Sequence, residues 1–368
     1  MIRSLPTTML SSALLLASAA SAAELSASGS VDAGYKTNLD SLANSPVSGY
    51  NLEANFTLDA KLSDKVSAQV FATALTGGVG VPGEFGPGVD SAGNYLQRWP
   101  FFAFDGAAIV WKLSDSKTLT IGDVVSAKGS VAYYAAKRYS TVTRVAAIRG
   151  VGYSDGAFSG FFGANDASDI LYTAGASYTF AIDSSSSVEP AATITVGEKS
   201  DFPWNGGVQY KGKFGAFALS ASAAGYGGKD TADKSKFGYV LVAEPSYTTE
   251  AFYLASAALF APKAKDGLGD LFAYPLRHGR TYKAWGDDMT FYVEPGVNFA
   301  GGAAAAGLAV EYHEPSMDAD KDEYIYIIPN LYLYPVKDMT ITLWAEADKY
   351  MEDKAMTFAL GLETVFKF

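Results

Sequence analysis

The sequence of 368 residues contains no cysteine and only two histidines. Without cysteine, the chain has no disulfide framework, no thiolate zinc site, no CxxC redox pair and no lipidated cysteine of a bacterial lipoprotein. Charged residues are scarce as well, at 18% of the chain, and 39 acidic residues outnumber 28 basic ones. Nucleic-acid binding requires a cationic surface, so the composition argues against a nucleic-acid partner.

Long apolar runs are missing except near the N-terminus. Met1-Ile2-Arg3 gives a positive start, an apolar stretch follows from Met9 to Ala20, and Ala20-Ser21-Ala22 has the form of a cleavage site. These features predict a secretory signal peptide over residues 1–22. A membrane anchor is the weaker alternative, because the stretch is shorter than the roughly 20 residues that span a bilayer. Cleavage after Ala22 leaves 346 of the 368 residues, and Arg3 is the only charge removed, so the net charge changes from −11 to −12.

Glycine, tyrosine and phenylalanine are abundant, at 37, 23 and 22 residues, and the pattern is one of strict alternation. Every second residue from Tyr50 to Leu62 is apolar and every residue between them is polar. Successive side chains of a strand point to opposite faces, so this segment has one apolar and one polar face. Such runs are about twice as long as an average soluble strand and match the roughly 9–11 residues of a membrane-barrel strand.

Eighteen such runs are predicted as strands, and the alternation of apolar and polar residues continues without a slip from the first to the last. The alternation is weakest in the fourth to sixth runs, so sixteen strands is the alternative. They lie at 24–36, 49–62, 66–76, 101–113, 118–127, 139–153, 157–165, 169–182, 188–198, 206–211, 216–226, 237–245, 251–261, 290–299, 303–313, 323–334, 339–350 and 355–368. Short turn-forming links alternate with long Gly- and Asp-rich segments along the chain. This is the layout of an outer-membrane barrel with periplasmic turns and extracellular loops.

The last run ends at Phe368, with Phe366, Leu362 and Leu360 on the same face. This end resembles the C-terminal signature of Gram-negative outer-membrane β-barrels, of the porin-like kind. The resemblance implies that Phe366 and Phe368 form a signal read by the barrel assembly machinery. The expected fold is an all-β, closed antiparallel transmembrane barrel of 16–18 strands, spanning residues 23–368. The alternative is a secreted β-sandwich, whose apolar faces would have to be buried.

Several catalytic-looking strings fit this fold as connections. Gly78–Gly83 matches GxGxxG but is followed by prolines, whereas the nucleotide fingerprint requires a strand before it and a helix after it. Gly152–Gly156 matches GxSxG, yet a further strand follows, so an Asp-Gly hairpin is predicted there. We therefore expect no catalytic residues, and a barrel hydrolase using His313 and Glu311 has no identifiable nucleophile.

We expect the chain to bind no metal and no cofactor. Asp318, Asp320 and Asp322 have the spacing of a calcium loop, but its expected Gly and Glu positions are Glu323 and Pro329. A solvated acidic loop is the simpler interpretation of this segment.

If the apolar face meets lipid, the polar face lines a water-filled interior. Inward acids outnumber inward bases, which favours cations, although pairing of acids with bases across the interior would cancel the preference. The candidate pore-lining residues are Asp32, Glu53, Asp59, Lys61, Arg144, Glu244, Glu294, Glu311, Glu346, Asp348 and Glu363.

Two further features concern selectivity. General porins, which the layout resembles, fold one long loop into the barrel, and the basic segment 262–289 or the segment 77–100 is the candidate here; a loop that stays outside is the alternative. The candidate constriction residues are Arg277, His278, Arg280 and Lys283. Inward aromatic rings are suited to stacking on sugars, unless they pack on one another or belong to an interfacial girdle. These residues are Tyr324, Tyr326, Tyr332, Tyr334, Trp344 and Tyr350.

The leading functional prediction is a channel of the cell outer membrane for passive diffusion of small hydrophilic solutes or ions. The alternative is a surface structural or adhesion protein with a plugged barrel and partner-binding loops. The expected partners are outer-membrane lipid and lipopolysaccharide, small hydrophilic solutes and the barrel assembly machinery. A homo-trimer is typical of porins, but no residue in the sequence marks an interface.

Overall fold

The computed structural model describes residues 24–39, 48–77, 101–131, 139–165, 171–196, 204–229, 235–260, 287–315, 324–350 and 356–368. The predicted signal peptide and the segment 262–286 lie outside these ranges.

The described chain is almost entirely β-strand. The first half contains β1 (Glu24–Asn38), β2 (Ser48–Lys61), β3 (Val66–Gly77), β4 (Phe101–Lys112), β5 (Thr118–Val131), β6 (Tyr139–Ser154), β7 (Phe158–Asn165), β8 (Leu171–Tyr178), β9 (Phe180–Ala181) and β10 (Ser186–Val196). The second half contains β11 (Trp204–Phe214), β12 (Phe217–Lys229), β13 (Ser235–Thr248), β14 (Phe252–Phe260), β15 (Asp287–Phe299), the 3-10 turn η3 (Ala300–Gly302), β16 (Ala304–Pro315), β17 (Tyr324–Leu333), β18 (Met339–Tyr350) and β19 (Met356–Lys367). No helix among the described residues is long and apolar enough to cross a membrane.

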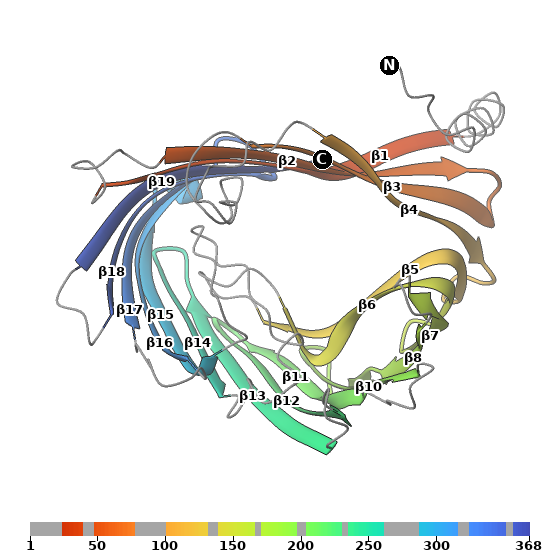
Figure 1. Cartoon of the computed structure of the whole chain (residues 1–368). Helices are drawn as coiled ribbons and strands as arrows, with labels where there is room; N and C mark the ends of the chain where they lie inside the picture. The colour runs from red at the N-terminus through yellow and green to blue at the C-terminus, as the bar shows by residue number, and fades with distance from the viewer. Residues whose placement is uncertain are drawn as a thin grey trace, which may run out of the picture.

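The strands form one closed antiparallel sheet (Figure 1). β8 and β9 are separated only by Thr179 and both pair with β10, so they act as one strand and the barrel has eighteen. Closure occurs at β1, where Asp32 lies opposite Glu53 of β2 and opposite Val365 of β19. All eighteen predicted strands are confirmed, and the alternative of sixteen is wrong.

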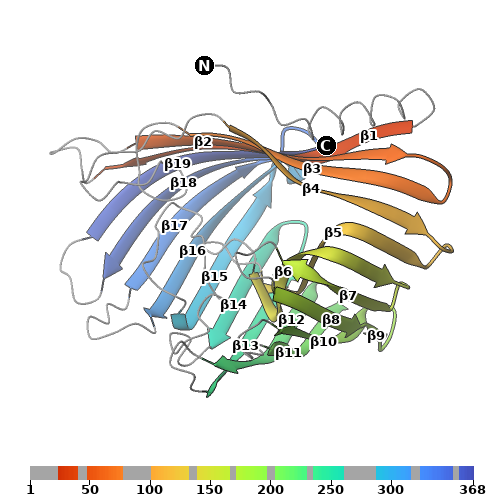
Figure 2. The same ribbon diagram turned by 45° about the vertical axis from the view of Figure 1, so that its right-hand side comes forward.

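Short turns join the strands at one end of the barrel (Figure 2). Those at 62–65, 155–157 and 215–216 are examples, and the GxSxG string runs from the end of β6 into the turn at 155–157. Asp155 accepts a hydrogen bond from the Phe158 amide at 2.8 Å, which confirms the predicted hairpin. The connections at the opposite end all include residues outside the described ranges.

The outer face of the barrel is apolar and exposed, while polar side chains are buried inside. On β15, Phe291 and Val293 are 48% and 41% exposed, whereas Tyr292 and Glu294, which alternate with them, are 6% and 3% exposed. Polar residues inside and apolar residues outside is the reverse of a soluble protein, and it is the arrangement expected of a barrel in lipid.

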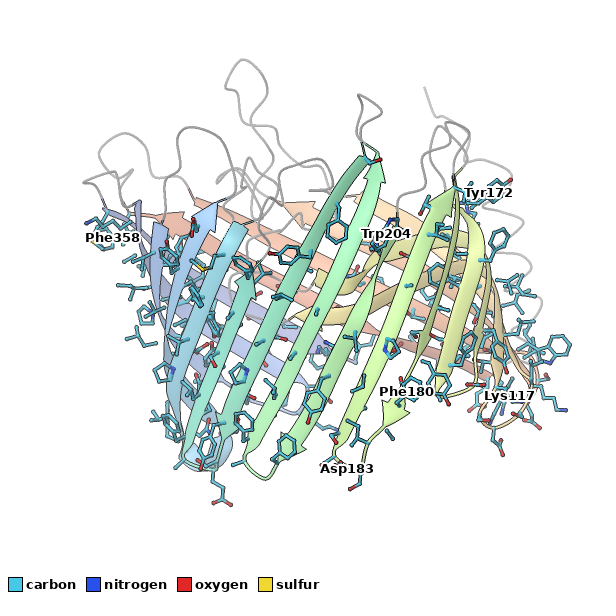
Figure 3. All side chains as sticks on the ribbon, turned by 90° about the horizontal axis from the view of Figure 1, so that it is seen from below. Lys117, Tyr172, Phe180, Asp183, Trp204 and Phe358 are labelled. Carbon is cyan, nitrogen blue, oxygen red and sulfur yellow. The ribbon has the colours of Figure 1, made fainter. Side chains whose placement is uncertain are left out.

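Aromatic pairs lie on the outer face near both ends of the strands. Near the loop end, Phe162 stacks on Tyr172 with centroids 6.1 Å apart; near the turn end, Phe214 stacks on Phe217 at 6.4 Å. Figure 3 shows Tyr172, Trp204 and Phe358 near the loop end and Phe180 near the turn end. Phe252 and Phe260 of β14 are eight residues apart, about 27 Å along a strand at about 3.4 Å per residue. At a strand tilt of about 40° this spans about 21 Å across the membrane, slightly less than the roughly 25 Å apolar band of membrane barrels.

The C-terminal residue completes the ladder. Gly29 and Phe368 exchange two backbone hydrogen bonds of 3.0 and 3.1 Å, so the chain end is bonded to β1. The Phe368 ring lies 6.1 Å from that of Phe366 and 6.3 Å from that of Phe56. The predicted assembly signal therefore lies in the outer aromatic belt at the turn end, and its recognition by assembly machinery stays a prediction.

The expectation of unbroken phase is wrong. The β3–β4 register shifts between Phe71 and Ala72, which leaves Asp105 as an extra residue on β4. The β5–β6 pairing shifts near Lys128, and the β15–β16 pairing shifts between Asp287 and Met289. The extra residue of a bulge reverses the face on which the later residues of that strand lie. Counting alternate positions along the sequence therefore assigns those residues to the wrong face.

Candidate functional site: the barrel lumen

The candidate acids were predicted to face the interior of the barrel, called the lumen below, and those with described side chains differ in exposure. Asp32, Asp59 and Glu244 are partly exposed, and Asp59 accepts a hydrogen bond from Gln69 at 3.1 Å. Four described acids, one each on β15, β16, β18 and β19, are buried. These four are Glu294 at 3%, Glu311 at 0%, Glu346 at 4% and Glu363 at 4% exposure.

For three other candidate pore-lining residues, the structure describes the strand but not the side chain. Glu53, Arg144 and Asp348 lie on β2, β6 and β18, and their side chains are outside the described part of the structure. Lys61 ends β2 at the turn end, where it forms ion pairs with Asp64 at 3.2 Å and Glu24 at 3.8 Å. Its charge is therefore largely compensated by local partners.

Glu294 is the centre of a buried hydrogen-bond cluster. Tyr253 donates to its Oε1 at 2.9 Å, Tyr332 donates to the same oxygen at 2.8 Å, and Tyr292 donates to Oε2. Gly307 lies beside the cluster, where a Cβ would collide with the carboxylate and the Tyr253 hydroxyl. The cluster therefore links side chains of β14, β15 and β17 through one acid, since each phenol satisfies part of its acceptor capacity.

Three of the six predicted sugar-stacking rings, Tyr326, Tyr332 and Trp344, are packed into the wall, whereas Tyr334 is exposed. Tyr326 and Trp344 are 3% and 4% exposed, and the Trp344 ring lies against Gly361, where a side chain would collide with it. Tyr332 donates to Glu294, and Tyr334 follows β17 at the turn end. The side chains of Tyr324 and Tyr350 are outside the described part. Rings buried in this way present little free face to a solute, so the sugar role stays a prediction.

The β5–β6 hairpin leaves the wall and enters the lumen. Pairing of β4 with β5 ends at Ala108–Gly122, and pairing of β6 with β7 ends at Arg149–Ala164. Beyond these points β5 and β6 pair with each other, and β6 contacts β10, β11, β12 and β13. Figure 1 shows β6 crossing the interior toward β11 and β12.

This hairpin narrows the lumen and was not anticipated from the sequence, which predicted ordinary strands at these positions. The residues predicted to form a constriction, Arg277, His278, Arg280 and Lys283, lie outside the described ranges, as does the segment 78–100. The hairpin carries Arg144 on β6, so this candidate belongs to the inserted element and not to the wall.

A small polar contact marks the point where the hairpin diverges. Asp123 accepts a hydrogen bond from the Ala107 amide at 2.8 Å and from the Arg149 guanidinium at 3.2 Å. Gly122 has φ of +125°, and a Cβ there would collide with the Ala107 carbonyl. The Asp123 carboxylate thus replaces the backbone acceptor that the Ala107 amide loses where β5 leaves β4, and Gly122 permits the bend of β5.

Apolar residues occupy inward positions on the strands facing the hairpin and beside them. Val240 and Val242 on β13 are 1% and 5% exposed, and Leu259 on β14 is 1% exposed. Ile148 of β6 is buried as well, at 3% exposure. Contact with water is unfavourable for inward valine side chains, and the contact of β6 with β13 accounts for the burial of those on β13.

A pocket opens on the lumen at the turn end of β10–β15. Its volume is 610 Å³, and its lining includes Lys211, Ser220, Glu244, Ser246 and Tyr292. At its edge, hydrogen bonds from Ser185 hold the pKa of Asp183 below its ordinary value, so this exposed turn residue stays anionic. The pocket thus combines hydroxyl groups with charges of both signs.

No group of three or more metal-ligating side chains is found among the described residues. The Asp318–Asp322 segment and His278 lie outside the described ranges, and His313 is on β16 with its side chain undescribed. The absence of a cofactor stays a prediction.

Comparison with known proteins identifies the fold. No family model and no curated protein matches the sequence. Among solved structures, OccAB1 of Acinetobacter baumannii has a TM-score of 0.59 at 11% identity, covering 94% of this chain and 96% of that one. A BenF-like porin from Pseudomonas fluorescens Pf-5 has a TM-score of 0.59 at 12% identity, with coverages of 94% and 98%. OpdK of Pseudomonas aeruginosa, crystallised with vanillate, has a TM-score of 0.57 at 10% identity, with coverages of 93% and 98%. The chain therefore has the eighteen-stranded fold of these outer-membrane porins.

Proposed function

We propose that this chain forms a channel for passive diffusion of small hydrophilic solutes across the outer membrane. The observation that carries the proposal is the closed barrel with an apolar outer face and a polar lumen. Barrels of 16–18 strands generally leave an aqueous passage, which here is narrowed by the β5–β6 hairpin. A passive channel requires no catalytic group, so we infer that the chain is not an enzyme.

The solved relatives support a small organic solute. OpdK was crystallised with vanillate, and the BenF-like protein is described as a porin. At 10–12% identity these proteins share the fold with this chain, so the solute has to be inferred from this chain's own lumen.

A mild preference for cations is part of the proposal. Among described inward side chains, acids outnumber bases, but Glu294, Glu311, Glu346 and Glu363 are buried. The acids that face the passage more openly are Asp32, Asp59 and Glu244. Because exposed charges are screened by salt, the preference should be stronger at low ionic strength.

We further propose export through the predicted signal peptide, recognition of Phe366 and Phe368 by the barrel assembly machinery, and contact of the outer aromatic belts with lipid and lipopolysaccharide. The stacked outer aromatic pairs support membrane contact. A homo-trimer, as porins typically form, is the proposed assembly.

Planar-bilayer recording of refolded protein tests the channel. We expect stable single-channel openings, with a reversal potential in a salt gradient that indicates cation preference and falls toward zero as salt is raised. Absence of openings at high protein load would overturn the channel and favour the second candidate, a structural or adhesion protein with a plugged barrel. The buried inward residues Val240 and Leu259 and the inserted hairpin are the observations that favour that candidate.

A further inference from the structure

Three inward residues form a row of charge, hydroxyl and opposite charge across adjacent strands. Lys211 of β11 lies opposite Ser220 of β12, and Ser220 lies opposite Glu244 of β13. All three line the 610 Å³ pocket on the lumen. The row is fixed by sheet register and not by a loop, so the order of the three groups is set by the wall itself.

The separation of the two charges suits a small bridging solute. Two strand spacings of about 4.8 Å place the Cα atoms of Lys211 and Glu244 about 10 Å apart. Within the described part of the chain, the Lys211 ammonium has no ion pair or hydrogen bond, and its side chain is exposed. Its flexible four-carbon stem lets the ammonium reach across Ser220 toward a ligand.

We propose that this row binds small zwitterions of the α-amino acid type, a role that rests on the proposed channel for access. The solute carboxylate accepts hydrogen bonds from the Lys211 ammonium and the Ser220 hydroxyl. The solute ammonium donates to the Glu244 carboxylate, and the hydroxyl of Ser246 lies beside it in the same pocket.

The physical reason for choosing a zwitterion is charge balance. A solute with only a carboxylate would place its charge near Glu244, and a solute with only an ammonium would place its charge near Lys211. A zwitterion places an opposite charge beside each of the two side chains at once, and charge-assisted hydrogen bonds are stronger than neutral ones. The pocket is several times larger than such a solute, so side chains of different size are accommodated.

The test compares L-alanine with propionate, which lacks the ammonium, and ethylamine, which lacks the carboxylate. Calorimetric titration of detergent-folded protein measures binding without requiring conduction, and block of single-channel current measures it in the passage. We expect alanine to bind and block at least about tenfold more tightly than either analogue. Lys211→Gln and Glu244→Gln should each abolish this advantage.

The exchanged double variant, Lys211→Glu with Glu244→Lys, should keep the preference for alanine, because it inverts the row and retains both charges. Lys112→Gln is the matched control, since Lys112 lies on β4 and pairs with Asp115 at 3.2 Å away from the pocket. It should leave alanine binding unchanged.

The outcomes separate this site from the channel. A protein that conducts ions but binds alanine no better than propionate or ethylamine would overturn the site alone. Binding of alanine that needs Lys211 and Glu244, in a protein that never conducts, would support the site and overturn the channel. If Lys112→Gln lost as much alanine binding as Lys211→Gln, the site would also be overturned, because the loss would then follow from the change in the net charge of the protein.

Discussion

At the scale of single residues, Glu294 shows how the lumen wall differs from a simple polar lining. Alternation in the sequence predicts an inward position for it, and the structure shows a buried carboxylate that accepts hydrogen bonds from three tyrosines. Period-two alternation predicts which face a residue occupies. It does not predict whether that residue meets water or a neighbouring side chain, because that depends on partners brought from strands far apart in the sequence.

Replacing Glu294 by Gln tests the cluster. The substitution exchanges one acceptor oxygen for a donor group, so at least one buried phenol loses its acceptor, and we expect a loss of about 1–3 kcal/mol in unfolding free energy. Denaturant unfolding of the protein in lipid vesicles measures the loss.

Glu250→Gln is the matched control, because Glu250 is exposed in the turn between β13 and β14. It should change the unfolding free energy by less than about 0.5 kcal/mol. An equal effect of the two substitutions would contradict the structural role of Glu294.

At the scale of elements, the strand ranges were predictable and the fate of one hairpin was not. Alternation persists where one face of a strand meets lipid, and the pattern is weakest in the fourth to sixth runs, which include β5 and β6. Their departure from the wall depends on bulges, on Gly122 and on a docking surface inside the barrel. Asp123 and Arg149 at otherwise apolar outward positions, and Val240 and Val242 at inward ones, are the sequence signals that interrupt the pattern.

Asp123 should control the position of the β5–β6 hairpin. Asp123→Ala removes the acceptor for the Ala107 amide, so we expect larger and noisier single-channel currents as the hairpin becomes less firmly held. Asp123→Asn retains an acceptor oxygen for that amide and should remain close to the wild type. The arginine of the Asp123–Arg149 ion pair is largely exposed to solvent, so this pair contributes little to holding the hairpin in position.

Asp115→Ala, which removes an exposed turn carboxylate paired with Lys112, controls for loss of charge nearby and should leave the current unchanged. Currents of Asp123→Ala that match the wild type would show that the hairpin is held by its contacts with β10–β13 and not at the point of divergence.

At the scale of the whole molecule, the fold follows from one physical requirement. Hydrocarbon offers backbone groups no hydrogen bonds, so the sheet has to close, and the Gly29–Phe368 backbone bonds complete that closure. The C-terminal run and the even number of strands made this predictable. The solute, in contrast, depends on inward side chains such as Lys211 and Glu244, whose neighbours are set by register that sequence alternation alone does not determine.

The central claim is that even-numbered residues of β12 face the lumen and odd-numbered ones face lipid. The chain has no cysteine, so single cysteines can be introduced on a silent background. Ser220→Cys places a thiol in the lumen and Ala221→Cys places one on the adjacent outward position. During bilayer recording, a charged, membrane-impermeant thiol reagent should modify Ser220→Cys with a stepwise fall in current and leave Ala221→Cys unaffected. Current loss at Ala221→Cys with none at Ser220→Cys would contradict the account.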